Sequence, residues 1–125
     1  MVSRYRVAVI ESDADVRELV AAILDAAGFE VLAVPSAELL ARSWRGDVIV
    51  TDTFETPYRT SAAVAYVGSL RARWHTPIVV VSGHREATRD QTLLGADFVV
   101  DKPFEMDELT DTVVRAAHLQ RASPD

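Results

Sequence analysis

The sequence predicts a single α/β domain in which five strand–helix units build a parallel sheet with helices on both faces. Two observations lead to this prediction. Short runs of β-branched residues recur along the chain, and stretches with apolar spacing near 3.6 residues separate them. The length of 125 residues is that of one domain, and 49% hydrophobic residues is ordinary for a globular protein.

The five expected strands share an apolar, β-branched composition. They are Val7–Ile10, Val31–Val34, Val48–Val50, Ile78–Val81 and Phe98–Val100. Four of the five are nearly continuous rather than alternating, which is typical of strands buried on both faces. Strands of this kind, each followed by a helix, form a parallel sheet.

Three helices are expected in the first part of the chain, and each has an apolar stripe that would face the sheet. The inward positions are Val16, Leu19, Val20, Ile23, Leu24 and Ala27 in the first, Leu40 and Trp44 in the second, and Ala63, Tyr66, Val67, Leu70 and Trp74 in the third. Gly28 would end the first helix, and Ser36 would cap the second after Pro35.

Two further helices are expected toward the C-terminus. The fourth covers roughly residues 85–94, is weakly patterned and is closed by Gly95. The fifth would turn inward the apolar residues Met106, Leu109, Val113 and Ala117. The folded domain is then expected over residues 1–121, with a short polar tail at 122–125.

Composition excludes several classes of function. The absence of cysteine excludes a disulfide framework, a thiolate nucleophile and a cysteine-ligated metal. The net charge of −6 and the scattered basic residues argue against nucleic-acid binding by this chain alone. No apolar run approaches the ~18 residues of a membrane span, and the N-terminus is too polar for a signal peptide. We therefore expect a cytoplasmic protein that does not bind membranes.

Polar residues gather where four of the expected strands end. The segments are Glu11-Ser12-Asp13, Thr51-Asp52, Ser82-Gly83 and Asp101-Lys102-Pro103. Sites in open parallel sheets form beyond the carboxyl ends of the strands, so these groups should lie at one edge. Gathered carboxylates repel one another, and Lys102 together with Mg²⁺ would offset their charge. A carboxylate held in this way can attack a phosphoryl group and form an acyl phosphate.

In this order and spacing the chain resembles a response regulator receiver domain of two-component signal transduction. The supporting pattern is an acidic position after the first strand, Asp52 after the third, Ser82 after the fourth, and Lys102-Pro103-Phe104 after Gly95-Ala96-Asp97. The resemblance covers nearly the whole chain. It implies a flavodoxin-like, doubly wound (βα)5 three-layer sandwich with strand order 2-1-3-4-5.

The resemblance also implies roles for individual residues. Asp52 would be the phosphoacceptor, and Ser82 and Lys102 would contact the phosphoryl group. Mg²⁺ would be held by Glu11, Asp52 and the backbone carbonyl of Phe54, with Asp13 or Ser12 as a further ligand. The peptide bond before Pro103 would be cis. A histidine kinase or phosphotransfer protein would donate the phosphoryl group, and a downstream protein or a second copy would bind the surface formed by the fourth helix, fifth strand and fifth helix.

Three departures from the family pattern separate this chain from an ordinary receiver. Ser12 occupies a position where a second carboxylate usually binds Mg²⁺, so metal binding should be weakened. Val99 occupies the position of an aromatic switch residue, and Phe98 is one place too early to face the same side. The loop at 53–59 has its proline one residue late and lacks the customary acidic–glycine turn.

Several alternatives stay open at this stage. Asp52 and Asp13 could instead cap following segments, and Ser12 competes with Asp13 for the cap of the first helix. A pseudo-receiver that binds partners without phosphorylation is the main alternative function. Enzymes on related folds fit poorly, because no G-x-G-x-x-G or P-loop is present and Phe54 stands where a phosphatase would need a second aspartate. We expect no turnover beyond slow autodephosphorylation.

Overall fold

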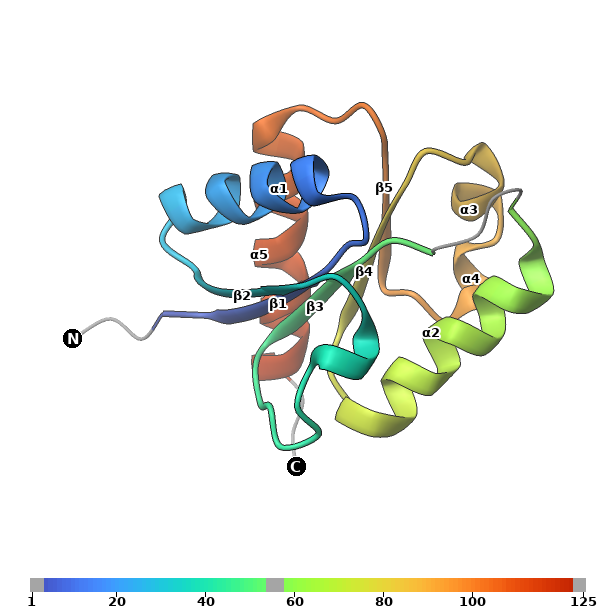
Figure 1. Ribbon diagram of the computed structural model, residues 1–125, viewed down its shortest axis with the longest axis horizontal. Helices are drawn as coiled ribbons and strands as arrows, with labels where there is room; N and C mark the ends of the chain where they lie inside the picture. The colour runs from blue at the N-terminus through green and yellow to red at the C-terminus, as the bar shows by residue number, and fades with distance from the viewer. Residues whose placement is uncertain (1–3, 54–57, 123–125) are drawn as a thin grey trace.

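The computed structural model describes residues 4–53 and 58–122 as a five-stranded sheet covered by helices on both faces (Figure 1). The strands are β1 (Arg6–Ile10), β2 (Glu30–Val34), β3 (Val48–Thr51), β4 (Ile78–Ser82) and β5 (Phe98–Asp101). All pairings are parallel, and the order β2-β1-β3-β4-β5 confirms the expected one. The polar tail expected at 122–125 lies outside the described residues, apart from Ala122.

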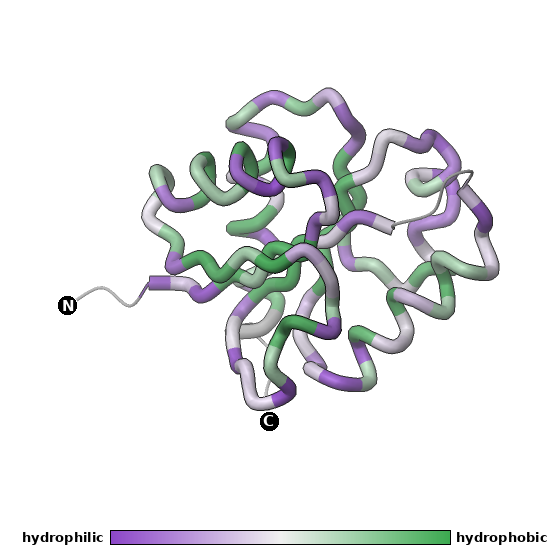
Figure 2. The backbone as a smooth tube through the Cα atoms, in the orientation of Figure 1, coloured by the Kyte–Doolittle hydropathy of each residue, from purple (hydrophilic) through white to green (hydrophobic). Residues whose placement is uncertain are grey.

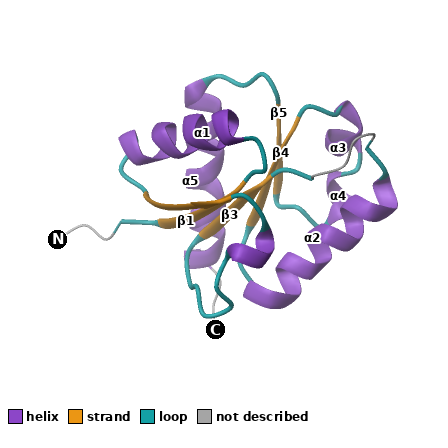
Figure 3. Cartoon of the chain, viewed as in Figure 1, coloured by secondary structure: helices purple, strands orange, loops and turns teal. Residues whose placement is uncertain are grey.

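The helices form two layers, which Figure 3 shows on either side of the strands. Helices α1 (Ala14–Ala26) and α5 (Met106–Ala122) cover one face, and α2 (Thr60–Trp74) and α4 (Gln91–Leu94) cover the other, with α3 (Arg85–Arg89) beside them. Alternate residues of β1 enter opposite cores, because successive side chains of a strand point to opposite faces: Val7 and Val9 enter one, Ala8 and Ile10 the other. Figure 2 shows hydrophobic residues, in green, along the strands in the middle of the fold.

The strands are buried on both faces only in the centre of the sheet. Strands β3 and β4 are buried throughout, and β1 is buried after Arg6. The edge strands β2 and β5 are half-exposed, and Leu32 of β2 is 45% exposed. At the sheet edge each of these strands has a strand neighbour on one side only, and the continuous apolar sequence of β2 and β5 does not mean that their side chains are fully buried.

The expected second helix does not form. Only a single 3₁₀ turn, η1 (Ala37–Leu39), lies between β2 and β3, and the side chain of Ser36 makes no capping hydrogen bond. Leu40 and Trp44 are nonetheless buried, as predicted. The indole Nε1 of Trp74 donates to the carbonyl of Ala41 at 3.1 Å, which fixes this segment by a tertiary contact rather than by helical pairing.

The expected fourth helix is divided in two. Helix α3 ends at Arg89 and α4 begins at Gln91, and Asp90 between them has a non-helical backbone (φ −92°, ψ 9°). Gly95 ends α4 with φ +74°, the left-handed conformation in which glycine carries no Cβ penalty. The interruption places the Asp90 side chain inside the protein, where it is 4% exposed.

Some apolar positions expected to face inward are exposed instead. Leu19 is 54% exposed and Met106 61%, Ala27 follows α1 as an exposed residue, and Tyr66 is half-buried. In α1 the buried side chains are Val20, Ile23 and Leu24, so the stripe in contact with the sheet is narrower than the sequence indicates. Among the described residues, no helix is both long and apolar enough to cross a membrane.

Candidate functional site

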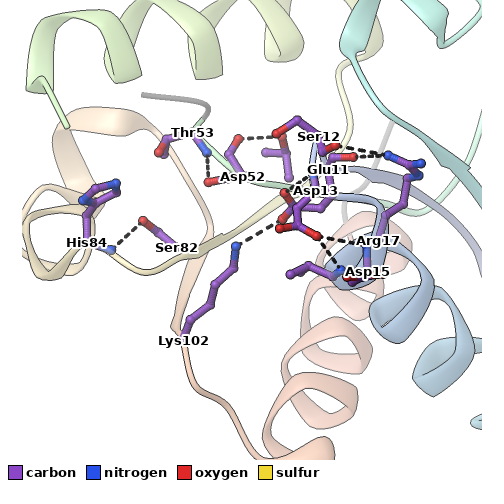
Figure 4. A network of polar contacts seen from close by, with 12 residues as sticks. Glu11, Ser12, Asp13, Asp15, Arg17, Asp52, Thr53, Ser82, His84 and Lys102 are labelled. Carbon is purple, nitrogen blue, oxygen red and sulfur yellow. Dashed lines mark hydrogen bonds and ion pairs between the residues drawn. The ribbon is translucent and has the colours of Figure 1, made fainter. Parts of the chain in front are cut away.

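Four strand ends bring Glu11, Asp52, Ser82 and Lys102 to one edge of the sheet (Figure 4). Each residue follows or ends a strand of the central sheet, and the parallel direction of the strands carries all four to the carboxyl edge. The Lys102 backbone N–H donates to the Ser82 carbonyl at 2.9 Å, which aligns the end of β5 with the end of β4. The edge therefore combines two carboxylates, a hydroxyl and an ammonium.

Glu11 is the buried carboxylate of this group, only 4% exposed. One oxygen, Oε1, accepts from the Lys102 ammonium at 3.2 Å, and Oε2 accepts from the Asp13 backbone N–H at 3.1 Å. Burial raises the pKa of Glu11 above its usual value, and the negative charge of Asp52 raises it further, although both hydrogen bonds oppose this. The site thus holds more negative charge than Lys102 alone relieves.

Asp52 follows β3 and is half-buried. Its Oδ1 accepts from the backbone N–H of Thr53 at 2.6 Å. Within the described residues, this is the hydrogen bond that the Asp52 side chain makes, and it leaves Oδ2 without a described partner. The Thr53 hydroxyl beside it is buried and lacks a hydrogen-bond partner within the described part of the chain. Asp52 does not cap α2, whose N-cap position is Arg59. Its contact with Thr53 is with the start of the following loop, one of the two structural alternatives that the sequence left open.

Ser82 ends β4 and is fully buried. Its Oγ accepts from the backbone N–H of His84 at 3.0 Å. Because the oxygen serves as acceptor in this contact, the hydroxyl can still donate one hydrogen bond to another group. A buried hydroxyl of this kind can donate to an anionic oxygen.

Lys102 directs its ammonium at Glu11 rather than at Asp52, with which it forms no ion pair in this structure. The Lys102–Pro103 peptide bond is cis, as the resemblance implies. The side chain of Lys102 is half-buried. The positive charge of Lys102 therefore lies inside the site, but its direct partner is Glu11 and not Asp52, the expected acceptor.

Asp13 caps α1, which was the structural alternative to a metal-binding role. Its Oδ1 accepts the backbone N–H groups of Asp15 and Val16 at 2.9 and 3.1 Å. Ser12 beside it is exposed. Sequence reasoning missed Arg17, whose Nη1 donates to the Glu11 carbonyl at 2.8 Å and braces the loop that carries both residues. No sequence signal distinguishes this arginine from other polar residues of the helix.

The carboxylates at this edge have the charge that a Mg²⁺ ion requires, but the described residues offer few ligands for it. Glu11 and Asp52 repel one another at the edge, and a divalent cation would relieve that repulsion. Within residues 4–53 and 58–122, however, no three acidic or histidine side chains cluster as a metal site. The Phe54 carbonyl, the remaining expected ligand, lies outside the described residues. In the part of the chain that the structure describes, two carboxylates, Glu11 and Asp52, are thus the charges that would hold the ion.

A second polar cluster, which the sequence did not reveal, borders the site. The buried Asp90 carboxylate accepts from the Tyr58 hydroxyl at 3.0 Å and from the Thr60 hydroxyl at 2.6 Å. Arg89 adds hydrogen bonds from Nε and Nη2 at 3.0 and 3.2 Å. An aspartate within a helical pattern is normally expected at the surface, so nothing in the sequence indicated that Asp90 lies in the interior. The contact between positions 58 and 90 forms only in the folded chain.

Val99, at the expected switch position, packs against the core beneath α2, whereas Phe98 packs against the core beneath α1 and α5. The two neighbours therefore face opposite sides of the sheet, as strand geometry predicts. An aromatic ring is absent from the side of β5 that Val99 occupies. Trp44 and Trp74 are core residues, as predicted.

The comparison with solved structures identifies the fold. The sequence matches no family model and no curated protein. The structural neighbours are response regulator receiver domains. CheY4, a chemotaxis response regulator of Vibrio cholerae, matches with a TM-score of 0.74 and 24% identity, over 91% of this chain and 99% of that chain.

Two further structures extend the likeness. The signal receiver domain of a putative LuxO repressor protein from Vibrio parahaemolyticus matches with a TM-score of 0.75 and 14% identity, over 96% of this chain and 95% of that chain. NtrX from Brucella abortus, solved with ATP, matches with a TM-score of 0.80 and 23% identity over 96% of this chain. This chain spans only 28% of the NtrX chain. The chain thus has the fold of receiver domains.

Proposed function

We propose that this protein is a response regulator receiver that accepts a phosphoryl group on Asp52 and signals by protein–protein contact. The observation that supports this most is the convergence of Asp52, Ser82, Lys102 and Glu11 at the carboxyl edge of a receiver-fold sheet. A histidine kinase or phosphotransfer protein would be the donor. We place the protein in the cytoplasm, where such donors present their phosphohistidines.

The proposed chemistry is a transfer of the phosphoryl group between nucleophiles. The Asp52 Oδ2 attacks phosphorus, a P–O bond to the carboxylate forms, and the P–N bond of the phosphohistidine breaks with its electrons on the leaving imidazole, which takes up a proton. The Ser82 hydroxyl donates a hydrogen bond to a phosphoryl oxygen. Lys102, drawn from Glu11, offsets charge on the same group. Bound Mg²⁺, held by Glu11 and Asp52, would supply further positive charge.

The protein phosphorylated on Asp52 would act through the surface formed by α3, α4, β5 and α5. Leu93 of α4 is 66% exposed and Met106 of α5 is 61% exposed, so this surface offers apolar side chains to a partner or to a second copy of the chain. The acyl phosphate would hydrolyse slowly without turnover of a substrate. We therefore do not assign the protein an enzymatic function.

A pseudo-receiver is the second candidate. It is favoured by the exposed Ser12, by the engagement of both Glu11 oxygens, and by Val99 in place of an aromatic residue. Such a protein would bind partners through the same surface without modification of Asp52. The two candidates differ in whether Asp52 can be phosphorylated.

Intact-mass spectrometry after incubation with acetyl phosphate separates them. We expect a gain of one phosphoryl group that increases with Mg²⁺ and is absent in Asp52→Asn, which keeps the size of the side chain but removes the nucleophile. Circular dichroism of both proteins establishes that each is folded. A folded wild-type protein without phosphoryl gain, with or without Mg²⁺, would instead identify a pseudo-receiver.

A further inference from the structure

The buried Asp90 carboxylate holds two residues at the start of the segment that leads into α2, Tyr58 and Thr60. It lies at the break between α3 and α4 and receives the hydroxyls of Tyr58 and Thr60, which are more than 25 residues away in sequence. Hydrogen bonds from Arg89 and Thr60 lower the pKa of Asp90 to about 2, so the carboxylate is charged at neutral pH. A charged acceptor makes the stronger kind of hydrogen bond.

Tyr58 connects this carboxylate to the phosphorylation site. Its hydroxyl donates to Asp90, and burial together with Asp90 raises its pKa to about 12, so the phenol keeps its proton. Its ring lies against the imidazole of His84, with ring centroids 5.5 Å apart. The His84 backbone N–H in turn holds Ser82 Oγ at 3.0 Å (Figure 4). Asp90, Tyr58, His84 and Ser82 thus form a continuous chain of contacts.

We propose that Tyr58 and Asp90 are positioning residues for phosphoryl transfer to Asp52, and that they act through His84 on the hydroxyl of Ser82. This inference rests on the proposed function. The direction of the Ser82 proton depends on where its acceptor contact lies, because a hydroxyl whose oxygen accepts the His84 N–H directs its proton elsewhere. The Tyr58 ring limits the movement of His84, and Asp90 holds that ring in place.

The alternative is that Asp90 only stabilises the fold by filling the break between two short helices. That role predicts a loss of stability that does not depend on Ser82. A positioning role predicts that the effect on phosphoryl transfer disappears once the Ser82 hydroxyl is gone. Non-additivity of two substitutions is therefore the discriminating measurement.

The experiment measures the rate of phosphoryl gain from acetyl phosphate by intact mass, in the full chain. The proteins are wild type, Tyr58→Phe, Ser82→Ala and the double variant, with Asp90→Ala as a second way to remove the same hydrogen bond. Tyr58→Phe keeps the ring on His84 and removes only the contact with Asp90. Tyr5→Phe is the matched control, since Tyr5 lies against Phe29 and His118, away from the site.

We expect Tyr58→Phe to slow phosphorylation about threefold to tenfold, the effect of losing one hydrogen bond. In the Ser82→Ala background the same change should have no further effect, and Tyr5→Phe should match wild type. Equal slowing by Tyr58→Phe in both backgrounds would overturn the inference alone. Absence of phosphoryl gain in the wild-type protein would overturn the proposed function and this inference with it.

Discussion

Lys102 and Glu11 set the charge balance of the site. Their contact at 3.2 Å offsets the charge of one carboxylate, while the described contact of the Asp52 side chain is the backbone N–H of Thr53. A transferred phosphoryl group brings further negative charge to an edge that already holds two carboxylates. The ammonium of Lys102 is therefore the charge on which phosphorylation should depend most.

Replacing Lys102 with alanine tests this dependence. We expect phosphoryl gain from acetyl phosphate to fall by about 100-fold or more, because a charged donor to the transition state is lost. The fold should persist, since Lys102 is half-buried at the sheet edge and its backbone hydrogen bond to Ser82 is kept. Intact mass measures the first effect and circular dichroism the second. Normal phosphorylation in this variant would remove Lys102 from the mechanism.

Substitutions of Ser12 test the proposed metal site. Ser12→Asp adds a carboxylate beside Glu11, and we expect it to tighten Mg²⁺ binding several-fold because cation affinity follows ligand charge. Ser12→Asn is the matched control of similar size without charge. A metal titration followed by calorimetry measures both variants. Equal affinities for the two would show that residue 12 does not face the ion.

The segment between β2 and β3 illustrates structure decided by packing rather than by local propensity. Within residues 35–47 the regular structure is the single 3₁₀ turn η1. The buried Trp44 ring lies so close to Gly46 that a Cβ at position 46 would be 2.2 Å from it. The Arg6 carbonyl would lie 2.9 Å from the same Cβ. The absence of a side chain at position 46 is therefore required by its neighbours.

Gly46→Ala should destabilise the protein by about 1–3 kcal/mol, the usual effect of overpacking a tight site. Gly68→Ala is the matched control, because a Cβ at Gly68 meets no atom within 4 Å and lies in a helix, where alanine is favoured. Urea denaturation followed by tryptophan fluorescence measures both. Equal stability of Gly46→Ala and wild type would mean that Trp44 moves aside without cost.

At the scale of the whole molecule, two buried carboxylates make opposite contributions to the pH dependence of stability. The pKa of Asp90 is lowered from 3.8 to about 2, so its contribution is present above pH 3.8 and is lost as pH falls toward 2. The pKa of Glu11 is raised above 4.5, so its ionised form destabilises the fold at neutral pH. Stability is recovered as pH falls through its folded pKa toward 4.5.

Denaturation midpoints measured between pH 2 and 7 without divalent metal should show both effects. We expect Asp90→Asn to flatten the profile below pH 3.8. We expect Glu11→Gln to remove the gain in stability on acidification above pH 4.5. Asp101→Asn, at an exposed position, serves as the control carboxylate. Profiles of the two variants that run parallel to wild type would contradict the assigned shifts.

The amino-acid sequence alone was enough to predict the five strands, the parallel sheet and the four strand ends that meet at the site. These follow from local patterns, since β-branched runs and helical periodicity report burial along one segment, and parallel strands carry their carboxyl ends to one edge. Asp52, Ser82, Lys102 and Glu11 could be named for that reason.

The pairing of those residues depends on contacts that form in the folded chain. Three contacts join positions far apart in the chain. They are the ion pair of Lys102 with Glu11, the hydrogen bond from Trp74 to Ala41 that holds the segment where no second helix forms, and the Tyr58–Asp90 hydrogen bond. Asp13 could cap α1 or bind a metal on sequence grounds alone, and the folded loop places its Oδ1 on two backbone N–H groups. Local patterns describe which face of a segment is apolar, whereas the partner of a polar side chain depends on what the fold brings within hydrogen-bond distance.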